Sequence, residues 1–323
     1  MGHLENLADA RKVVRNSFDV EDYYPAERDG WDEVYEKILA ILIGVVKGIE
    51  MVNPPYPTLD DLLEMIGQAG FHLAEIEASE GAAGNISVCM RWPVDPRNRF
   101  PVEEEFILPQ AVPELAGATF IVSGSGRRLR ELRQDPAVHL ACLTVNEGGE
   151  TAKLFTAYNR RFERVTSEFN SHLAVHYDQM TATDTNFHAV VHAQPLHLTY
   201  LSHIPRYQDE KYLNQHLLRW QPETIINLPE GIGFIPFMLP GSQDLMAANV
   251  TCLREHRIVI WSKHGVMARS DISVKRAADR VEYAETAAKY EYLNLQIGEI
   301  GEGLSPEEVR TICSTFNVEQ NIF

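Results

Sequence analysis

The sequence Phe187-His188-Ala189-Val190-Val191-His192-Ala193-Gln194 is a short apolar run that ends in polar side chains. Its small and β-branched residues predict a buried strand with a polar tip. Side chains alternate between the two faces of a strand, so His192 and Gln194 project to the same side, about 6.6 to 7 Å apart along the chain. Two such donors can serve one metal ion, although a single histidine at a strand end is usually structural.

A second run of the same kind is Ile258-Val259-Ile260-Trp261-Ser262-Lys263-His264-Gly265. It predicts another buried strand, which leads into His264 and a glycine. The two histidines form a metal site only if the fold brings the two strand ends together. The sequence alone leaves the structural and the metal-binding interpretations open.

Two glycine-rich loops adjoin predicted strands. Gly81-Ala82-Ala83-Gly84-Asn85 precedes one strand, and Ser123-Gly124-Ser125-Gly126-Arg127-Arg128 follows another. Glycine lets backbone N–H groups approach an anion closely, and Asn85 adds a side-chain donor. Neither loop matches a nucleotide-binding motif, and ordinary turns explain both equally well.

Thr166-Ser167-Glu168 stands where a helix is predicted to begin, and its hydroxyl groups are ordinary helix-capping groups. If this helix start faces a cleft, Ser167 offers an anion donor and Glu168 a carboxylate. His172 and His176 follow on the same helix face. Their spacing from Glu168 is not an established zinc arrangement, so packing or surface exposure is the simpler interpretation of both histidines.

The rest of the chain predicts a sheet covered by helices. Strands are expected over 85–92, 119–122, 140–145, 187–192, 231–237 and 257–261, and helices over 58–80, 168–179, 195–203, 242–256, 273–297 and 305–316. Strands outnumber clean strand-helix-strand alternations, which favours a mixed or largely antiparallel sheet. A further helix is expected over 31–50, and the proline-rich segment after it predicts a boundary near residue 57.

Composition excludes several classes of protein. Hydrophobic residues make up 45% and charged residues 23% of the 323, as in globular chains. The formal charge of −17 repels phosphate backbones and anionic lipid, so neither nucleic acid nor a membrane is an expected partner. No apolar run approaches the ~20 residues that a spanning helix needs. Four scattered cysteines without a signal peptide predict reduced thiols in the cytoplasm.

Five motifs, taken in order, resemble the class II aldolase/adducin superfamily, most closely its rhamnulose-1-phosphate aldolases. They are GNIS (84–87), the Gly/Ser loop after FIV (120–122), TSE (166–168), VVH (190–192) and KHG (263–265). The similarity runs from about residue 59 to the C-terminus. It implies an α/β fold of three α/β/α layers with a mixed, largely antiparallel central sheet. It also implies a catalytic domain over 58–323, and residues 1–57 are then a helical N-terminal extension.

The resemblance further implies a metal-dependent lyase that uses Zn²⁺ or another divalent cation. Such an enzyme cleaves a ketose 1-phosphate into dihydroxyacetone phosphate and an aldehyde, which is L-lactaldehyde if the sugar is rhamnulose. The implied metal ligands are His192 and His264, the implied catalytic residue is Glu168, and Glu223 aligns with a second functional glutamate that reaches a site from a neighbouring subunit. A homotetramer is implied as well. The implied phosphate-binding residues are Gly84, Asn85, Ser125, Gly126 and Ser167.

One position departs from the family pattern, which has His-x-His at the strand tip where this chain has His192-Ala193-Gln194. An amide oxygen is a poorer zinc ligand than an imidazole. This departure leaves several interpretations open. Gln194, water or His197 completes the set of metal ligands, or the enzyme uses another divalent metal, or the domain has kept the fold and lost the catalytic activity. The alternatives to an aldolase are therefore a non-catalytic interaction protein that resembles the adducin head and a related sugar-phosphate epimerase or dehydratase.

Overall fold

The computed structural model describes residues 51–298, 301–320 and 322–323. The chain divides into two units, residues 1–53 and 54–323, and every described helix and strand belongs to the second. The helix predicted over 31–50, and with it most of the predicted extension 1–57, lies outside the described residues. Within the described ranges, no helix combines the length and the apolar character needed to cross a membrane.

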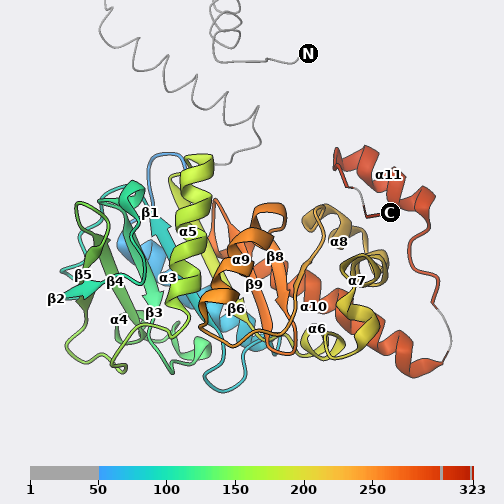
Figure 1. The fold of residues 1–323 in the computed structure, drawn as a ribbon, viewed down its shortest axis with the longest axis horizontal. Coiled ribbons are helices and arrows are strands. Elements are labelled where there is room, and N and C mark those ends of the chain that lie inside the picture. Colours follow the sequence, from blue (N-terminus) through green and yellow to red (C-terminus); the bar gives the residue numbers. More distant parts are fainter. Residues whose placement is uncertain (1–50, 299–300, 321) are drawn as a thin grey trace, which may run out of the picture. The chain divides into compact units, whose positions relative to one another are not determined.

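A nine-stranded sheet runs through the middle of this unit (Figure 1). Its spatial order is β2-β5-β4-β3-β1-β6-β9-β8-β7, and all neighbours are antiparallel except β7 and β8. The predicted mixed, largely antiparallel sheet is confirmed. The strands are β1 (Asn85–Met90), β2 (Val102–Ile107), β3 (Thr119–Ser123), β4 (Leu140–Val145), β5 (Thr151–Thr156), β6 (Phe187–Ala193), β7 (Gly233–Ile235), β8 (Ile258–Trp261) and β9 (Gly265–Ser270).

Helices cover both faces of the sheet, which confirms the predicted three layers. Helices α5 (Phe169–Thr183) and α9 (Gln243–Glu255) lie on one face, and α3 (Leu59–Glu75) and α10 (Val274–Ile297) lie on the other (Figure 1). Further helices pack along α10 and on one another, and α4 precedes β4. These are α4 (Pro136–His139), α6 (Leu196–Leu201), α7 (Glu210–Leu217), α8 (Pro222–Asn227) and α11 (Pro306–Phe316).

Most of the central strands, β9 excepted, are ones that the sequence predicted. Every residue of β1, β3, β6, β8 and β9 is buried, because helices cover both faces, and such strands appear as continuous apolar runs. Three strands were not predicted: β2, β5 and β9. Strand β2 is an edge strand that carries Glu103, Glu104 and Glu105, and such charges hinder pairing with another chain. Strand β9 begins directly after His264, where the sequence suggested only a strand end.

Capping residues set the starts of the long helices. Thr58 caps α3 in a reciprocal pair with Asp61: Thr58 Oγ1 accepts from the Asp61 N–H at 3.2 Å, and Asp61 Oδ2 accepts from the Thr58 N–H at 2.8 Å. Serines cap α9, α10 and α11. Helix α3 ends earlier than predicted, because the chain turns at Glu77, whose φ is 59°. Helices α7 and α8 were not predicted.

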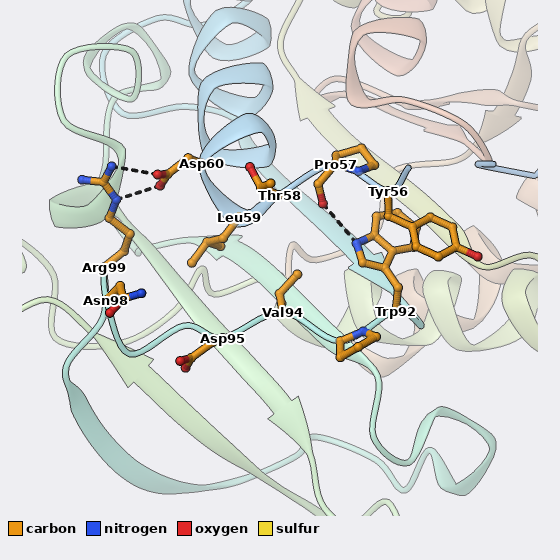
Figure 2. Close-up of a pocket in the computed structure, with 11 residues that line it drawn as sticks. Tyr56, Pro57, Thr58, Leu59, Asp60, Trp92, Val94, Asp95, Asn98 and Arg99 are labelled. Carbon is orange, nitrogen blue, oxygen red and sulfur yellow. Dashed lines mark hydrogen bonds and ion pairs between the residues drawn. The ribbon is translucent and has the colours of Figure 1, made fainter. Parts of the chain in front are cut away.

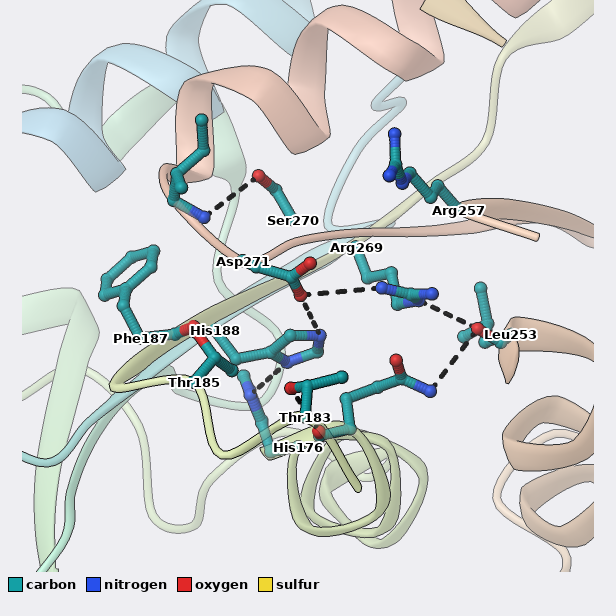
Figure 3. A network of polar contacts seen from close by, with 12 residues as sticks. His176, Thr183, Thr185, Phe187, His188, Leu253, Arg257, Arg269, Ser270 and Asp271 are labelled. Atoms are coloured by element: carbon teal, nitrogen blue, oxygen red, sulfur yellow. Dashed lines mark hydrogen bonds and ion pairs between the residues drawn. The ribbon is translucent and has the colours of Figure 1, made fainter. Parts of the chain in front are cut away.

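A buried polar network lies between α5 and β6 (Figure 3). His176 Nδ1 and His188 Nδ1 are 2.8 Å apart, and His188 Nε2 lies 3.8 Å from Asp271 Oδ1. Arg269 lies 3.5 Å from the same carboxylate and donates to the Leu253 carbonyl at 2.8 Å. His172 and His176 are both fully buried, which agrees with packing rather than surface exposure.

The buried histidines predict that acid destabilises the fold. Burial lowers the pKa of His172 to about 3 and holds the pKa values of His176 and His188 well below the usual 6.5, and Arg269 and Arg280 further lower the pKa of His188. Below about pH 6.5 these three histidines therefore bind protons in the unfolded state but not in the folded state. The free energy of unfolding is therefore highest above about pH 6.5. It falls as the pH is lowered, by up to about 1.4 kcal/mol per pH unit for each histidine.

Urea unfolding followed by tryptophan fluorescence between pH 5 and 7.5 measures this slope. We expect His188→Asn, which keeps a donor for His176 without a titrating ring, to reduce the slope by about 1.4 kcal/mol per pH unit. The exposed His203 provides the control, and His203→Asn leaves the slope unchanged. Equal slopes in His188→Asn and the wild type would show that His188 is not held neutral.

Candidate functional site

A small pocket lies at one end of four consecutive strands of the sheet, β3, β1, β6 and β9. Because neighbouring strands are antiparallel, the end of β3, the start of β1, the end of β6 and the start of β9 meet at this edge. The pocket has a volume of about 180 Å³. It is lined by Ala82, Ala83, Gly84, Asn85, Gly124, Ser125, Gly126, Thr166, Ser167, Glu168, His192, Gln194 and His264.

His192 is held in a defined orientation. It lies opposite Asn85 in the pairing of β1 with β6, and its ring stacks on Trp261 with centroids 4.6 Å apart. Its Nδ1–H donates to the Val266 carbonyl at 2.8 Å. This bond occupies Nδ1, and the other ring nitrogen, Nε2, lies 3.5 Å from Glu168 Oε2.

His264 reaches the pocket from the turn between β8 and β9. Lys263 takes a φ of 63° in this turn, and His264 Nε2 comes within 3.7 Å of Glu168 Oε1. Its Nδ1 is buried and has no hydrogen-bond partner among the described residues. Burial and the neighbouring His192 lower the pKa of His264 despite the opposing effect of Glu168, so the ring is a neutral donor of a lone pair near pH 7.

Glu168 is the N-cap residue of α5 and is buried beside both rings. Its Oε2 accepts a hydrogen bond from Asn85 Nδ2 at 2.7 Å. Burial by itself raises the pKa of Glu168, but the nearby His192, the hydrogen bond from Asn85 and His264 outweigh burial and lower the pKa below its ordinary value. Glu168 is therefore an ionised carboxylate inside the pocket.

Glu168, His192 and His264 together could hold a cation. Their ligand atoms all lie within 4.8 Å of one another. The free Nε2 of His192 and the uncommitted ring of His264 suit a borderline-soft divalent ion. Gln194 lines the same pocket, whereas His197 does not line it: its Nδ1 lies 2.6 Å from Glu285 Oε1.

The predicted anion loops also line this pocket. Gly84 has a φ of 84°, and a Cβ there would lie 2.9 Å from the His192 carbonyl oxygen, so only glycine lets this loop approach β6. Gly126 has a φ of 69° and open space around it. Ser167 is exposed at the start of α5, where the helix dipole favours an anion. Arg127 and Arg128, which follow the second loop, do not line the pocket.

One predicted catalytic residue lies elsewhere. Glu223 is exposed on α8 and does not line the pocket of its own chain. Sequence reasoning also missed some residues of the site. Thr166 and Gly124 line the pocket, and Trp261 supports His192. Trp261 was assigned only to a strand, because nothing in its sequence context indicates which ring it stacks against.

A larger cavity, of about 530 Å³, lies where α3 begins, and its polar groups are engaged with one another (Figure 2). Arg99 donates to both carboxylate oxygens of Asp60 at 2.7 and 3.0 Å. Trp92 stacks on Tyr56 and donates to the Pro57 carbonyl at 3.2 Å. Reactive groups gather instead in the smaller pocket around Glu168, which is therefore the candidate active site.

Comparison with known proteins identifies the family of this chain. The family described as Class II Aldolase and Adducin N-terminal domain matches residues 64–292. A rhamnulose-1-phosphate aldolase from Bacteroides thetaiotaomicron is 26% identical over 264 residues, which are 81% of this chain and 96% of the relative. Another from Listeria innocua is 28% identical over 206 residues, 64% of this chain and 74% of the relative.

A solved structure shows the same fold. The sugar-phosphate aldolase from Thermotoga maritima superimposes with a TM-score of 0.62 at 27% sequence identity, covering 76% of this chain and 99% of its own. The family match spans most of the chain and includes every residue that lines the pocket around Glu168. The chain belongs to the class II aldolase and adducin family and is an enzyme of the class II aldolase type.

Proposed function

We propose that this chain is a metal-dependent aldolase that cleaves a ketose 1-phosphate related to rhamnulose 1-phosphate. The products are dihydroxyacetone phosphate and an aldehyde such as L-lactaldehyde. One observation carries the proposal: a single pocket gathers a buried ionised carboxylate, two histidines and two glycine-rich loops. The relatives that act on rhamnulose 1-phosphate and on sugar phosphates support this class of substrate.

In this proposal His192 and His264 hold the divalent cation, zinc by its donor set, and Gln194 stands beside them in place of an imidazole. When bound, the cation polarises the C2 carbonyl of the ketose and offsets the negative charge that develops there as the C3–C4 bond breaks. The C4 hydroxyl gives up its proton as it becomes the aldehyde, and Glu168 takes up a proton and delivers it to C3, which completes dihydroxyacetone phosphate. Its position beside both rings and its ionised state suit it to hold and transfer that proton.

The phosphate group is proposed to bind in the same pocket, against its two glycine-rich loops. Two loops and the start of α5 supply backbone and side-chain donors there, and this local set overrides the net negative charge of the chain. The proposed phosphate-binding residues are Gly84, Asn85, Ser125, Gly126 and Ser167.

We also propose a homotetramer in which the partner subunit's Glu223 serves as a proton shuttle for the aldehyde half of the reaction. The exposure of Glu223 on α8 leaves it free to reach another chain. The four cysteines are unpaired thiols, which supports the proposal that the enzyme works in the cytoplasm.

Glu168→Gln tests the role of the carboxylate. We expect kcat for release of dihydroxyacetone phosphate from rhamnulose 1-phosphate to fall by about 10²- to 10⁴-fold, because the amide cannot transfer the proton. Coupled reduction of dihydroxyacetone phosphate measures the rate. The exposed Glu307→Gln on α11 is the matched control and keeps full activity. Lack of cleavage by the wild type across several ketose 1-phosphates would reject the aldolase and favour an epimerase or dehydratase.

Gln194→His tests the departure from the family pattern. An imidazole binds zinc better than an amide oxygen, so we expect the zinc dissociation constant to fall on the order of tenfold, which corresponds to about 1.4 kcal/mol. Calorimetric titration of the metal-stripped protein measures it. His197→Gln is the control, because His197 is engaged with Glu285 outside the pocket. If the wild type binds no metal and His264→Ala changes nothing, the scaffold alternative is favoured.

A further inference from the structure

A continuous chain of buried side chains joins the pocket to the interior of the protein. His172 Nε2 contacts Asn85 Oδ1, and His172 Nδ1 lies 2.6 Å from Ser87 Oγ. Ser87 Oγ lies 2.7 Å from His176 Nε2, and His176 Nδ1 lies 2.8 Å from His188 Nδ1. The chain of contacts therefore runs between β1 and α5 and then on to β6. Its last two members, His176 and His188, are shown in Figure 3.

We propose that Ser87, His172 and His176 are positioning residues, which form a one-way hydrogen-bond chain that locks the amide of Asn85 with one N–H toward Glu168. This inference rests on the proposed function only in treating Glu168 as the catalytic residue. The orientation of the chain itself follows from the donors and acceptors along it.

Glu168 sets the direction of the first bond. A carboxylate only accepts hydrogen bonds, so Asn85 must present Nδ2 to Glu168 and Oδ1 to His172. His172 must then donate from Nε2, which leaves its Nδ1 as an acceptor for the hydroxyl of Ser87. The chain thus begins with each group donating toward Glu168.

The same logic continues to the far end. The Ser87 oxygen accepts from the Nε2–H of His176, and His176 Nδ1 accepts from the Nδ1–H of His188. Each of these rings is fully buried, and burial favours its neutral form with a single N–H. One neutral arrangement therefore satisfies every link while giving Glu168 a donor.

The reversed arrangement is excluded at the pocket. It would let His188 donate from Nε2 toward Asp271, 3.8 Å away, and every later link would reverse as well. Asn85 would then turn its carbonyl oxygen toward the Glu168 carboxylate, at the position where its amide nitrogen now donates at 2.7 Å. His188 Nε2 has no hydrogen-bond partner within reach among the described residues, so the favoured direction gives up no bond at this end.

The direction matters because an asparagine amide can rotate, and only one of its two orientations supports an ionised Glu168. A hydrogen bond to the charged form of a carboxylate stabilises that form. Removing the Ser87 hydroxyl leaves the acceptor Nδ1 of His172 without its partner, so nothing behind the ring then favours the tautomer with N–H at Nε2. The contact by which His172 holds the amide of Asn85 is thereby weakened.

Ring tautomers provide a direct test that needs neither metal nor substrate. Solid-state NMR of the metal-stripped, ¹⁵N-histidine-labelled protein at pH 7.5 distinguishes protonated from bare ring nitrogens, and loss of signals in His172→Phe and His188→Asn assigns them. We expect N–H at Nε2 of His172 and His176 and at Nδ1 of His188. An Nδ1–H at His172, or a charged His172 ring, would overturn the proposal even if the protein proves to be an aldolase.

Kinetics provide the second test. Positioning groups behind an active residue typically contribute 10- to 100-fold, so we expect Ser87→Ala to lower kcat by about that factor with zinc affinity unchanged. Ser171→Ala is the matched control: Ser171 precedes His172 on α5, is as buried as Ser87, and its hydroxyl has no hydrogen-bond partner among the described residues. It should leave kcat unchanged.

A conservative variant separates positioning from general packing. His172→Gln places an amide N–H where the Nε2–H of His172 lies and should retain most of the activity, whereas His172→Phe should lose as much as Ser87→Ala. Equal losses in the glutamine and phenylalanine variants, or a Ser87→Ala variant that loses zinc binding while kcat stays unchanged, would contradict the positioning role. The NMR result stands whether or not dihydroxyacetone phosphate is released.

Discussion

The antiparallel pairing of β1 with its neighbours is the constraint on which the site depends. Asn85 lies directly opposite His192 in the register of β1 and β6, and β9 continues the same edge with the turn that carries His264. Starts and ends of antiparallel strands alternate along one edge of a sheet. Four loops that are far apart in the sequence therefore open into a single pocket of about 180 Å³.

Helix α5 connects this pocket to the core. Glu168 stands at its N-cap, and His172 and His176 follow on the same face of the helix, one and two turns further along. All three are buried, and each has polar partners from β1 or β6. Unpaired polar groups in a protein interior are costly, so the sheet and the helix can meet only where these partners align. The polar core and the active site are thus parts of one arrangement.

Much of this could be predicted from local patterns. The buried strands with His192 and His264, the glycine-rich loops and the capped start of α3 all stood out in the sequence. The exposed edge strand β2 did not, because three glutamates in succession do not resemble a strand until a sheet edge explains them. Arg127 and Arg128, at the end of the Gly/Ser loop, do not line the pocket, and their sequence position does not indicate which way their side chains point.

The sequence by itself determined the periodicities, the turns and the family, because these depend on residues that are near neighbours in the chain. It also placed Gln194 where the family has histidine. Only the tertiary structure decided that Gln194 lines the pocket while His197 binds Glu285 instead, and that Glu223 lies outside its own chain's pocket. It also decided that Ser87 links two histidines behind Asn85. Hydrogen-bond partners distant in sequence are chosen by strand register and helix packing, and local sequence carries no record of either.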